Sequence, residues 1–286
     1  MKSTYFHYAL SEALSRVLPL GAAYGVGRAV AGCIYAVSPG ERKTVEENLR
    51  AILGGASDGE LRAKAKEVYV NFSRYCVDLL YIGKPHGGQN GGGPAGRVTF
   101  ENKEAVERSL ARGKGAVVVT AHLGHWELAA MALARHHPVS VVANRHADER
   151  VDRLFMQRRA RHGVRVIPGG FALRPSLEAL AQNEIVGITG DREFSKNGGT
   201  ALEFFGRPAR LPRGAAALSA RSGAPIVGCS ILGGEDGRWR VRFEDPVFPD
   251  GLSEEDLQRR TVSFLEDAIR RDPTRWFVFD PFWSGA

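Results

Sequence analysis

Two residues five positions apart, His122 and Glu127, have side chains that suit proton transfer. A neutral imidazole takes a proton from an alcohol near pH 7, and a carboxylate on its other nitrogen fixes the tautomer and stabilises the imidazolium that forms. A histidine and a glutamate at this spacing are more often structural, with the histidine capping a turn and the glutamate complementing a helix dipole. The surrounding residues therefore decide between the two interpretations.

The element around His122 determines whether the two side chains meet. Residues 116–120, AVVVT, lack polar alternation, which predicts a strand buried on both faces of a parallel sheet. Residues 126–134 have the apolar spacing of a helix. On one continuous helix a spacing of five rotates two side chains about 140° apart. We therefore expect His122 in the turn after the strand, where Gly124 leaves room for its ring to fold back toward the helix.

Three further polar residues follow predicted strands. Arg145 follows one strand, and the adjacent residues Asp191 and Arg192 follow another. In open α/β sheets, ligands bind beyond the carboxyl ends of the strands. We expect these side chains to share a cleft with His122, where the two arginines bind phosphate or developing negative charge and Asp191 holds one of them. Taken singly, each of the three has an ordinary alternative as a surface or turn residue.

From residue 98 onward, short apolar runs alternate with segments of helical spacing. The predicted strands cover residues 116–120, 139–143, 164–167, 184–189, 225–232 and 238–243. The predicted helices cover residues 103–112, 126–134, 149–161, 175–182, 211–222 and 253–271. This alternation is typical of an α/β domain with a mostly parallel or mixed central sheet flanked by helices.

The preceding segment, residues 1–82, is predicted to be helical and to face a membrane. Residues 41–53 and 58–82 have helical spacing. Residues 17–37 form an apolar stretch long enough to cross a bilayer, but Arg28 near its centre would cost about 2.5 to 3.5 kcal/mol there. An amphipathic segment lying on the membrane, or a hairpin against the domain, is therefore favoured over a span. An ordinary packed helix pair is the alternative.

The glycine-rich residues 83–97, GKPHGGQNGGGPAGR, separate the helical segment from the α/β domain. This composition predicts a linker without packed structure. It is not a phosphate loop, because no GK[ST] sequence follows. The chain therefore divides into a helical membrane-associated segment (1–82), a linker (83–97) and an α/β domain (98–286).

The charge balance points to an anionic partner. The net charge is +7, and residues 144–165 hold seven arginines against three acidic residues. Residues 205–221 add four arginines and no acid. No RNP motif, helix-turn-helix or zinc knuckle accompanies them, so we expect no nucleic acid. The three cysteines lie far apart without metal-ligand spacing, so neither a metal nor another cofactor is expected, and a reducing compartment fits.

The segment HLGHWE, residues 122–127, resembles the histidine-x4-acid motif of the glycerolipid acyltransferase superfamily. Its glutamate, together with Gly124 and Trp126, is similar to the version in the lipid A biosynthesis acyltransferase family of lauroyl and myristoyl transferases. The resemblance covers most of the chain through four ordered segments: ERKTVEENL (41–49), RGKGAVVVTAHLGHWE (112–127), the Asp-Arg pair (191–192) and FFGRPARLPRGAAALSARSGAPIV (204–227).

The resemblance implies a membrane-associated O-acyltransferase with His122 and Glu127 as its catalytic dyad. His122 would deprotonate an acceptor hydroxyl while Glu127 orients the imidazole. The acyl chain would come from acyl carrier protein or acyl-CoA, and the acceptor would be a phosphorylated glycolipid such as a lipid A precursor. No serine or cysteine occupies a nucleophile elbow, so no acyl-enzyme is expected. We expect the protein at the cytoplasmic face of the inner membrane, bound peripherally to its anionic surface.

This chain departs from the family pattern in ways that leave the acceptor open. His125 stands where a small polar residue is usual, residues 146–148 replace an asparagine-rich stretch, and residues 276–283, WFVFDPFW, lack the usual basic tail. A lysophospholipid, an aminolipid or a phosphatidylinositol mannoside is an alternative acceptor. A basic membrane-binding protein without catalysis is the alternative from another class.

Overall fold

The computed structural model describes residues 12–82, 98–193, 198–233 and 238–283. Seven strands form one sheet in the order β1-β9-β8-β2-β5-β3-β4, and β6 and β7 form a separate hairpin. The strands are β1 (Val98–Glu101), β2 (Ala116–Thr120), β3 (Val139–Ala143), β4 (Val164–Pro168), β5 (Ile185–Thr189), β6 (Thr200–Phe204), β7 (Arg207–Leu211), β8 (Ile226–Gly233) and β9 (Trp239–Phe243). Neighbours in the large sheet are parallel except β8 and β9, which confirms the predicted α/β class and its mostly parallel sheet.

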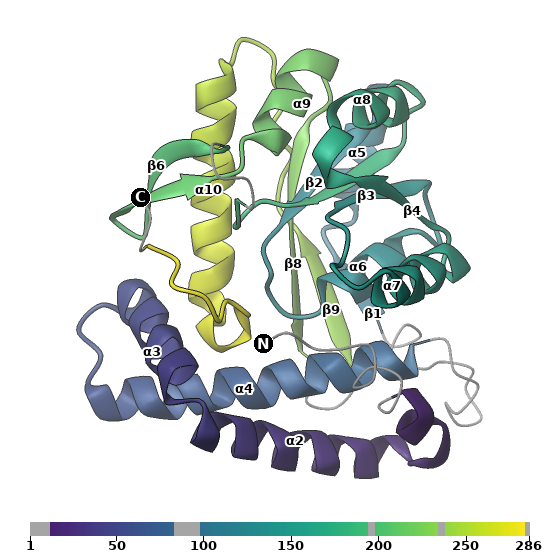
Figure 1. Cartoon of the computed structure of the whole chain (residues 1–286). Helices are drawn as coiled ribbons and strands as arrows, with labels where there is room; N and C mark the ends of the chain where they lie inside the picture. Colours follow the sequence, from purple (N-terminus) through teal and green to yellow (C-terminus); the bar gives the residue numbers. More distant parts are fainter. Residues whose placement is uncertain (1–11, 83–97, 194–197, 234–237, 284–286) are drawn as a thin grey trace.

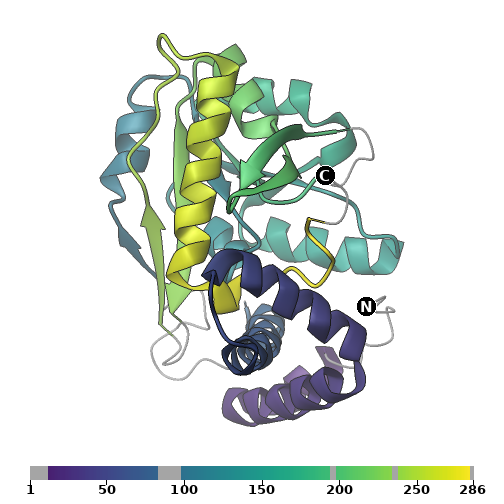
Figure 2. The ribbon, with the colours of Figure 1, turned by 90° about the vertical axis from the view of Figure 1, so that its left-hand side faces the viewer.

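Helices cover both faces of the sheet (Figure 1). The helices are α2 (Leu20–Val37), α3 (Pro39–Leu53), α4 (Asp58–Tyr81), α5 (Glu104–Leu110), α6 (Trp126–Leu133), α7 (Glu149–Arg161), α8 (Leu173–Ala181), α9 (Gly214–Ser222) and α10 (Glu254–Arg271). Helices α8, α9 and α10 contribute to the hydrophobic cluster on one face, and α5, α6 and α7 to the cluster on the other. Figure 2 shows α10 standing in front of the strands.

Strand β2 lies in the interior of the sheet, between β5 and β8. Val117 and Val119 belong to the cluster under α8 to α10, whereas Ala116 and Val118 belong to the opposite cluster. All four are buried, so neither face of the strand has a place for a polar side chain. This burial accounts for the absence of polar alternation from which the strand was predicted.

The prediction for residues 211–222 was wrong at its start. Helix α9 begins at Gly214, and Leu211 instead ends β7 of an antiparallel hairpin that was not predicted. Phe205 and Gly206 turn the hairpin with φ values of +54° and +70°. A proline cannot donate to a strand ladder, and the short two-stranded ribbon tolerates Pro208 because it lies outside the large sheet, where the register pairs it with Glu203.

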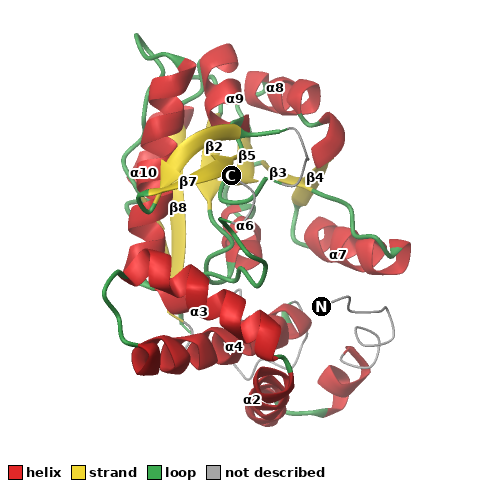
Figure 3. Cartoon of the chain, turned by 60° about the vertical axis from the view of Figure 1, so that its left-hand side comes forward, coloured by secondary structure: helices red, strands yellow, loops and turns green. Residues whose placement is uncertain are grey.

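Helices α2, α3 and α4 form a layer on one side of the sheet (Figure 3). Helix α2 lies along α4, where Ala23 and Ala31 are buried while Val26 and Val30 are exposed. By length and composition α2 could cross a membrane, and 11% of it is buried within the protein. The hydroxyl of Tyr24 donates to the carboxylate of Asp78, which ties α2 to α4. The predicted linker, residues 83–97, lies outside the described residues.

The helical layer also packs against the α/β part of the chain. Tyr75 of α4 stacks on Trp126 of α6 with ring centroids 4.6 Å apart and contacts Phe277 at 5.8 Å. A single hydrophobic cluster includes side chains from α3, α4, α6 and the sheet. The position of α4 is therefore tied to the start of α6, close to His122.

A second connection runs through the segment that follows α10. Asn48 of α3 is 4% exposed, and its amide nitrogen donates to the carbonyls of Val278 and Asp280, both at 3.1 Å. Its amide oxygen accepts the N–H of Phe282 at 3.3 Å. Asn48 lies in the ERKTVEENL segment that supported the family resemblance, and the structure supplies a physical reason for an asparagine there.

Replacing Asn48 with alanine should destabilise the protein by about 2 to 3 kcal/mol, because it leaves the buried Val278 carbonyl and two partly buried backbone groups without the Asn48 amide. Denaturant unfolding measures this change. Thr44→Ala, on the same helix, removes an exposed hydroxyl bonded to the Gly40 carbonyl and should change stability by less than about 0.5 kcal/mol. Equal midpoints for Asn48→Ala and the unmodified protein would contradict the anchoring role.

Candidate active site

The adjacent parallel strands β2 and β5 bring two polar side chains together at their carboxyl ends. Their register pairs Thr120 with Thr189, and each chain then turns out of the sheet. Two residues beyond these positions, His122 Nδ1 lies 2.8 Å from Asp191 Oδ1. The backbone N–H of His122 donates to the other oxygen, Oδ2, at 3.1 Å. The site therefore contains a histidine held by a carboxylate.

Asp191 is ionised despite being fully buried. Burial alone would raise the pKa of its carboxyl, but the neighbouring His122 imidazole, hydrogen bonds from His122 and the indole of Trp276 hold that pKa below its usual value. Trp276 Nε1 donates to Oδ2 at 2.8 Å. Because an ionised carboxylate only accepts hydrogen bonds, the neutral imidazole carries its proton on Nδ1 and presents Nε2 as its basic nitrogen.

Gly124 fixes the shape of the turn after His122. Its φ is +60°, in the left-handed region that glycine adopts most readily. A Cβ at this position would lie 2.3 Å from the carbonyl oxygen of Ile231 in β8. Glycine is required because the turn approaches β8 closely. The sequence had suggested a different reason, namely space for the His122 ring.

Glu127 does not occupy the position predicted for it. It lies in the first turn of α6, 6% exposed, and pairs with Arg159 of α7. Arg159 Nε donates to Glu127 Oε2 at 2.9 Å, and Arg159 NH2 donates to Oε1. The Glu127 carboxylate points toward α7, which carries Arg159. The His122 ring instead points toward Asp191, which follows β5. The predicted pairing of His122 with Glu127 is therefore corrected to a pairing with Asp191.

The two predicted arginines follow their strands as expected and form surface ion pairs. Arg145, after β3, donates through Nε to Asp152 at 3.2 Å and has a side chain that is 77% exposed. Arg192 donates to Asp280 at 2.5 Å and is 25% exposed. Asp191, predicted to hold an arginine, holds His122 instead.

His125 performs a structural task. Its Nδ1 accepts the N–H of Leu128 at 3.2 Å and so caps α6. Burial lowers the pKa of His125 to about 3, which keeps the ring neutral and able to accept. The cap needs only an acceptor near the backbone, which explains how histidine replaces the small polar residue usual at this position.

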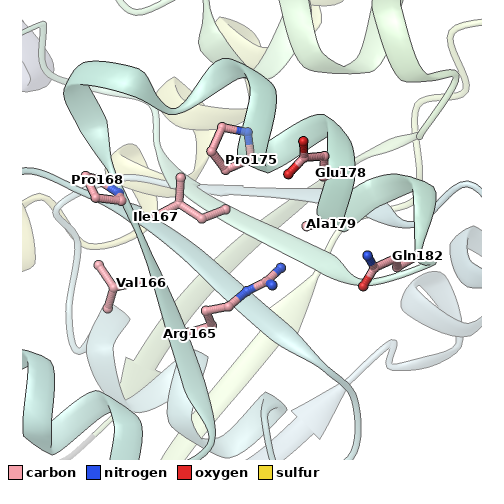
Figure 4. A pocket seen from close by; sticks show the side chains of 8 residues that line it. All are labelled: Arg165, Val166, Ile167, Pro168, Pro175, Glu178, Ala179 and Gln182. Carbon is pink, nitrogen blue, oxygen red and sulfur yellow. The ribbon is translucent and has the colours of Figure 1, made fainter.

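Two cavities among the described residues lie apart from this pair. One, of about 180 Å³, lies between β4 and α8, with Arg165, Pro168 and Pro175 among the residues that line it (Figure 4). A second, of about 270 Å³, lies beside β8 and α10. No group of three or more His, Cys, Asp or Glu side chains in the described part of the chain is placed to hold a metal ion.

The sequence did not identify two residues of this site. Arg159 was one of seven arginines in a basic segment, and nothing in its spacing marked it as the buried partner of Glu127. Trp276 belongs to an apolar segment far along the chain from His122, and its indole N–H reaches Asp191 only through the tertiary fold.

A histidine and a buried carboxylate at the carboxyl ends of neighbouring parallel strands define a site suited to deprotonating a hydroxyl. Residues 2–284 match the family described as bacterial lipid A biosynthesis acyltransferase, and the chain belongs to that family. It is an acyltransferase. It is 27% identical over 291 aligned positions, covering 96% of this chain and 90% of the relative, to a phosphatidylinositol mannoside acyltransferase of Mycolicibacterium smegmatis. A protein of the same description from Mycobacterium tuberculosis is 33% identical over 127 positions, 43% of this chain and 40% of the relative.

Glu127→Gln should destabilise the protein by about 3 to 5 kcal/mol, because it leaves the Arg159 guanidinium buried without its counter-charge. Adding Arg159→Met should recover part of the loss. Denaturant unfolding of the two variants measures both effects.

Glu255→Gln is the matched control, since it breaks an exposed pair with Arg259 and should cost about 1 kcal/mol or less. A Glu127→Gln protein with normal stability and lost turnover would instead support the direct catalytic role first predicted for Glu127.

Proposed function

We propose that this protein transfers a fatty acyl chain from an acyl thioester to a hydroxyl of a phosphorylated glycolipid, with His122 as the general base and Asp191 as the residue that orients it. The 2.8 Å contact between His122 Nδ1 and Asp191 Oδ1 carries the proposal. Glu127 contributes through its ion pair with Arg159, which holds the first turn of α6 beside His122.

In the proposed reaction, His122 Nε2 takes the proton from the acceptor hydroxyl as its oxygen attacks the thioester carbonyl. The C–S bond then breaks, and the departing thiolate takes the proton from the imidazolium. The products are an ester and a free thiol, so atoms and charges balance without an acyl-enzyme. Asp191 stabilises the imidazolium while it exists, because its carboxylate is ionised and fully buried.

For the acceptor, we propose a mannosylated phosphatidylinositol ahead of a lipid A precursor. Similarity to a phosphatidylinositol mannoside acyltransferase over 96% of this chain supports the first, and the family description supports the second. Both are phosphorylated glycolipids. Mass spectrometry of lipids from a deletion strain distinguishes them, because the lipid that lacks an acyl chain identifies the acceptor.

Arg145 and Arg192 are proposed to bind phosphate groups of the donor or the acceptor. Both follow strands that end at the same edge of the sheet as His122, and both guanidinium groups reach solvent, with side chains that are 77% and 25% exposed, so a phosphate can approach them. The donor is proposed to be acyl carrier protein or acyl-CoA, since each carries phosphate or acidic groups at the far end of the pantetheine arm that bears its thioester.

We also propose that the helical layer binds the anionic cytoplasmic face of the inner membrane peripherally. Helix α2 supports this proposal because it leaves Val26, Val30 and Val37 exposed while it packs along α4. The Tyr24–Asp78 hydrogen bond holds α2 against the protein, which favours a helix that lies on the membrane over one that leaves the domain to span it. The net charge of +7 matches an anionic surface.

His122→Gln should lower kcat for acyl transfer about 100- to 10,000-fold, because the base is lost, while the fold is kept. Asp191→Asn should also lower kcat, since an amide neither fixes the Nδ1–H tautomer nor stabilises the imidazolium. A purified-enzyme assay with acyl-CoA and each candidate glycolipid measures both. His136→Gln is the control, because this residue lies beyond the end of α6 against Phe100. A folded His122→Gln protein with normal turnover would rule out this mechanism.

Replacing Val26 and Val30 with glutamate should weaken binding to vesicles that contain phosphatidylglycerol by at least about tenfold, since two apolar side chains are replaced by charges repelled by the surface. Vesicle sedimentation measures this change. Leu173→Glu is the control, because Leu173 is similarly exposed at the start of α8, far from α2 in Figure 1. Unchanged binding would exclude α2 as the contact, and membrane protein released only by detergent would favour a true span.

A further inference from the structure

Residues 275–277 run antiparallel to the turn that carries His122. The N–H of Gly124 donates to the carbonyl of Arg275 at 2.9 Å, and the N–H of Phe277 donates to the carbonyl of His122 at 2.9 Å. The backbone on both sides of Leu123, the residue after His122, is therefore fixed by a segment that lies far away in the sequence.

Between these two backbone bonds, the Trp276 side chain reaches Asp191. Its Nε1 donates to Asp191 Oδ2 at 2.8 Å, and the residue is 3% exposed. The ring centroid lies 5.1 Å from that of Phe282 and 6.2 Å from that of Phe204. The packed ring cannot turn away, so its N–H has one direction in which to donate.

The two oxygens of Asp191 have different partners. Oδ1 faces the imidazole Nδ1 of His122, whereas Oδ2 accepts from the indole of Trp276 and from the backbone N–H of His122. A carboxylate rotates easily about its Cβ–Cγ bond unless hydrogen bonds hold both oxygens. A buried carboxylate that loses one of its donors also loses part of the stabilisation that compensates for its desolvation.

We propose that Trp276 is a positioning residue for acyl transfer: its indole N–H fixes the rotation of the Asp191 carboxylate, and Asp191 thereby holds His122 in the Nδ1–H tautomer with Nε2 as the base. This inference rests on the proposed function of the His122–Asp191 pair. The inference also gives a function to the segment 276–283, for which composition alone had indicated none. Trp276 touches Asp191 and acts through it.

Trp276→Phe tests the proposal, since it keeps an aromatic ring and removes the N–H donor. We expect kcat to fall about 10- to 100-fold with KM for donor and acceptor unchanged, because binding of neither substrate depends on the indole N–H. In the unliganded full-length protein, the ¹⁵N chemical shifts of the His122 ring should change from one Nδ1–H tautomer to a mixture of tautomers.

Trp283→Phe is the matched control. Trp283 belongs to the same aromatic cluster, 6.2 Å from Trp276, and its Nε1 donates to the Phe204 carbonyl at 3.2 Å and not to Asp191. It should keep both the kcat and the single His122 tautomer of the unmodified protein. If Trp276→Phe folds poorly, 3-benzothienylalanine at position 276 removes the N–H while keeping the bicyclic shape.

The outcomes separate this inference from the proposed function. A Trp276→Phe protein with normal kcat and an unchanged tautomer overturns the inference, as do equal losses in Trp276→Phe and Trp283→Phe, which would reflect aromatic packing alone. If the unmodified protein transfers no acyl group to any acceptor tested, the proposed function fails. The tautomer measurement then still supports or overturns the control of His122 by Trp276.

Discussion

The buried carboxylate of Asp191 is the constraint on which the rest of the site depends. A fully buried anion is tolerated only where hydrogen-bond donors and positive charge surround it. The carboxylate follows β5, and its donors come from two other parts of the chain: the turn after β2, which carries His122, and the segment after α10, which carries Trp276. The in-register pairing of β2 with β5 is what makes the two strand ends coincide. A slip of this register would leave the anion without its partners.

Two buried pairs lie close together in the site, Glu127 with Arg159 and His122 with Asp191. Their surroundings suit them to different roles. The Glu127–Arg159 pair forms a bidentate contact between α6 and α7, an arrangement suited to fixing helices because its two parallel hydrogen bonds set the geometry of both side chains. The His122–Asp191 pair contains an imidazole, which gains and loses a proton readily, and its histidine side chain is 18% exposed. Both carboxylates are buried, and only Asp191 faces a group that can change charge during a reaction.

Much of this arrangement is predictable from local sequence, and the remainder depends on tertiary contacts. The strand at 116–120 and the helix at 149–161 were predicted with the bounds that the structure shows, because burial and helical periodicity leave marks on neighbouring residues. The prediction that His122 and Asp191 lie at the same edge of the sheet also followed from the order of elements. The partner of His122 did not, because Glu127 is near in sequence while Asp191 is 69 residues away. Trp276 contacts Asp191 across 85 residues and left no local pattern to detect.

The position of residues 275–277 along the chain has a consequence for biosynthesis. A ribosome releases β2, the His122 turn and β5 well before it releases the strand partner of that turn, because Trp276 follows Asp191 by 85 residues. Until then the Gly124 N–H and the His122 carbonyl lack their backbone partners, and the Asp191 carboxylate lacks the indole of Trp276. A nascent chain therefore carries the histidine and the aspartate of the site without their fixed geometry. Acyl transfer by the proposed pair of His122 and Asp191 becomes possible only after Trp276 has been added, by which time α2 has already emerged.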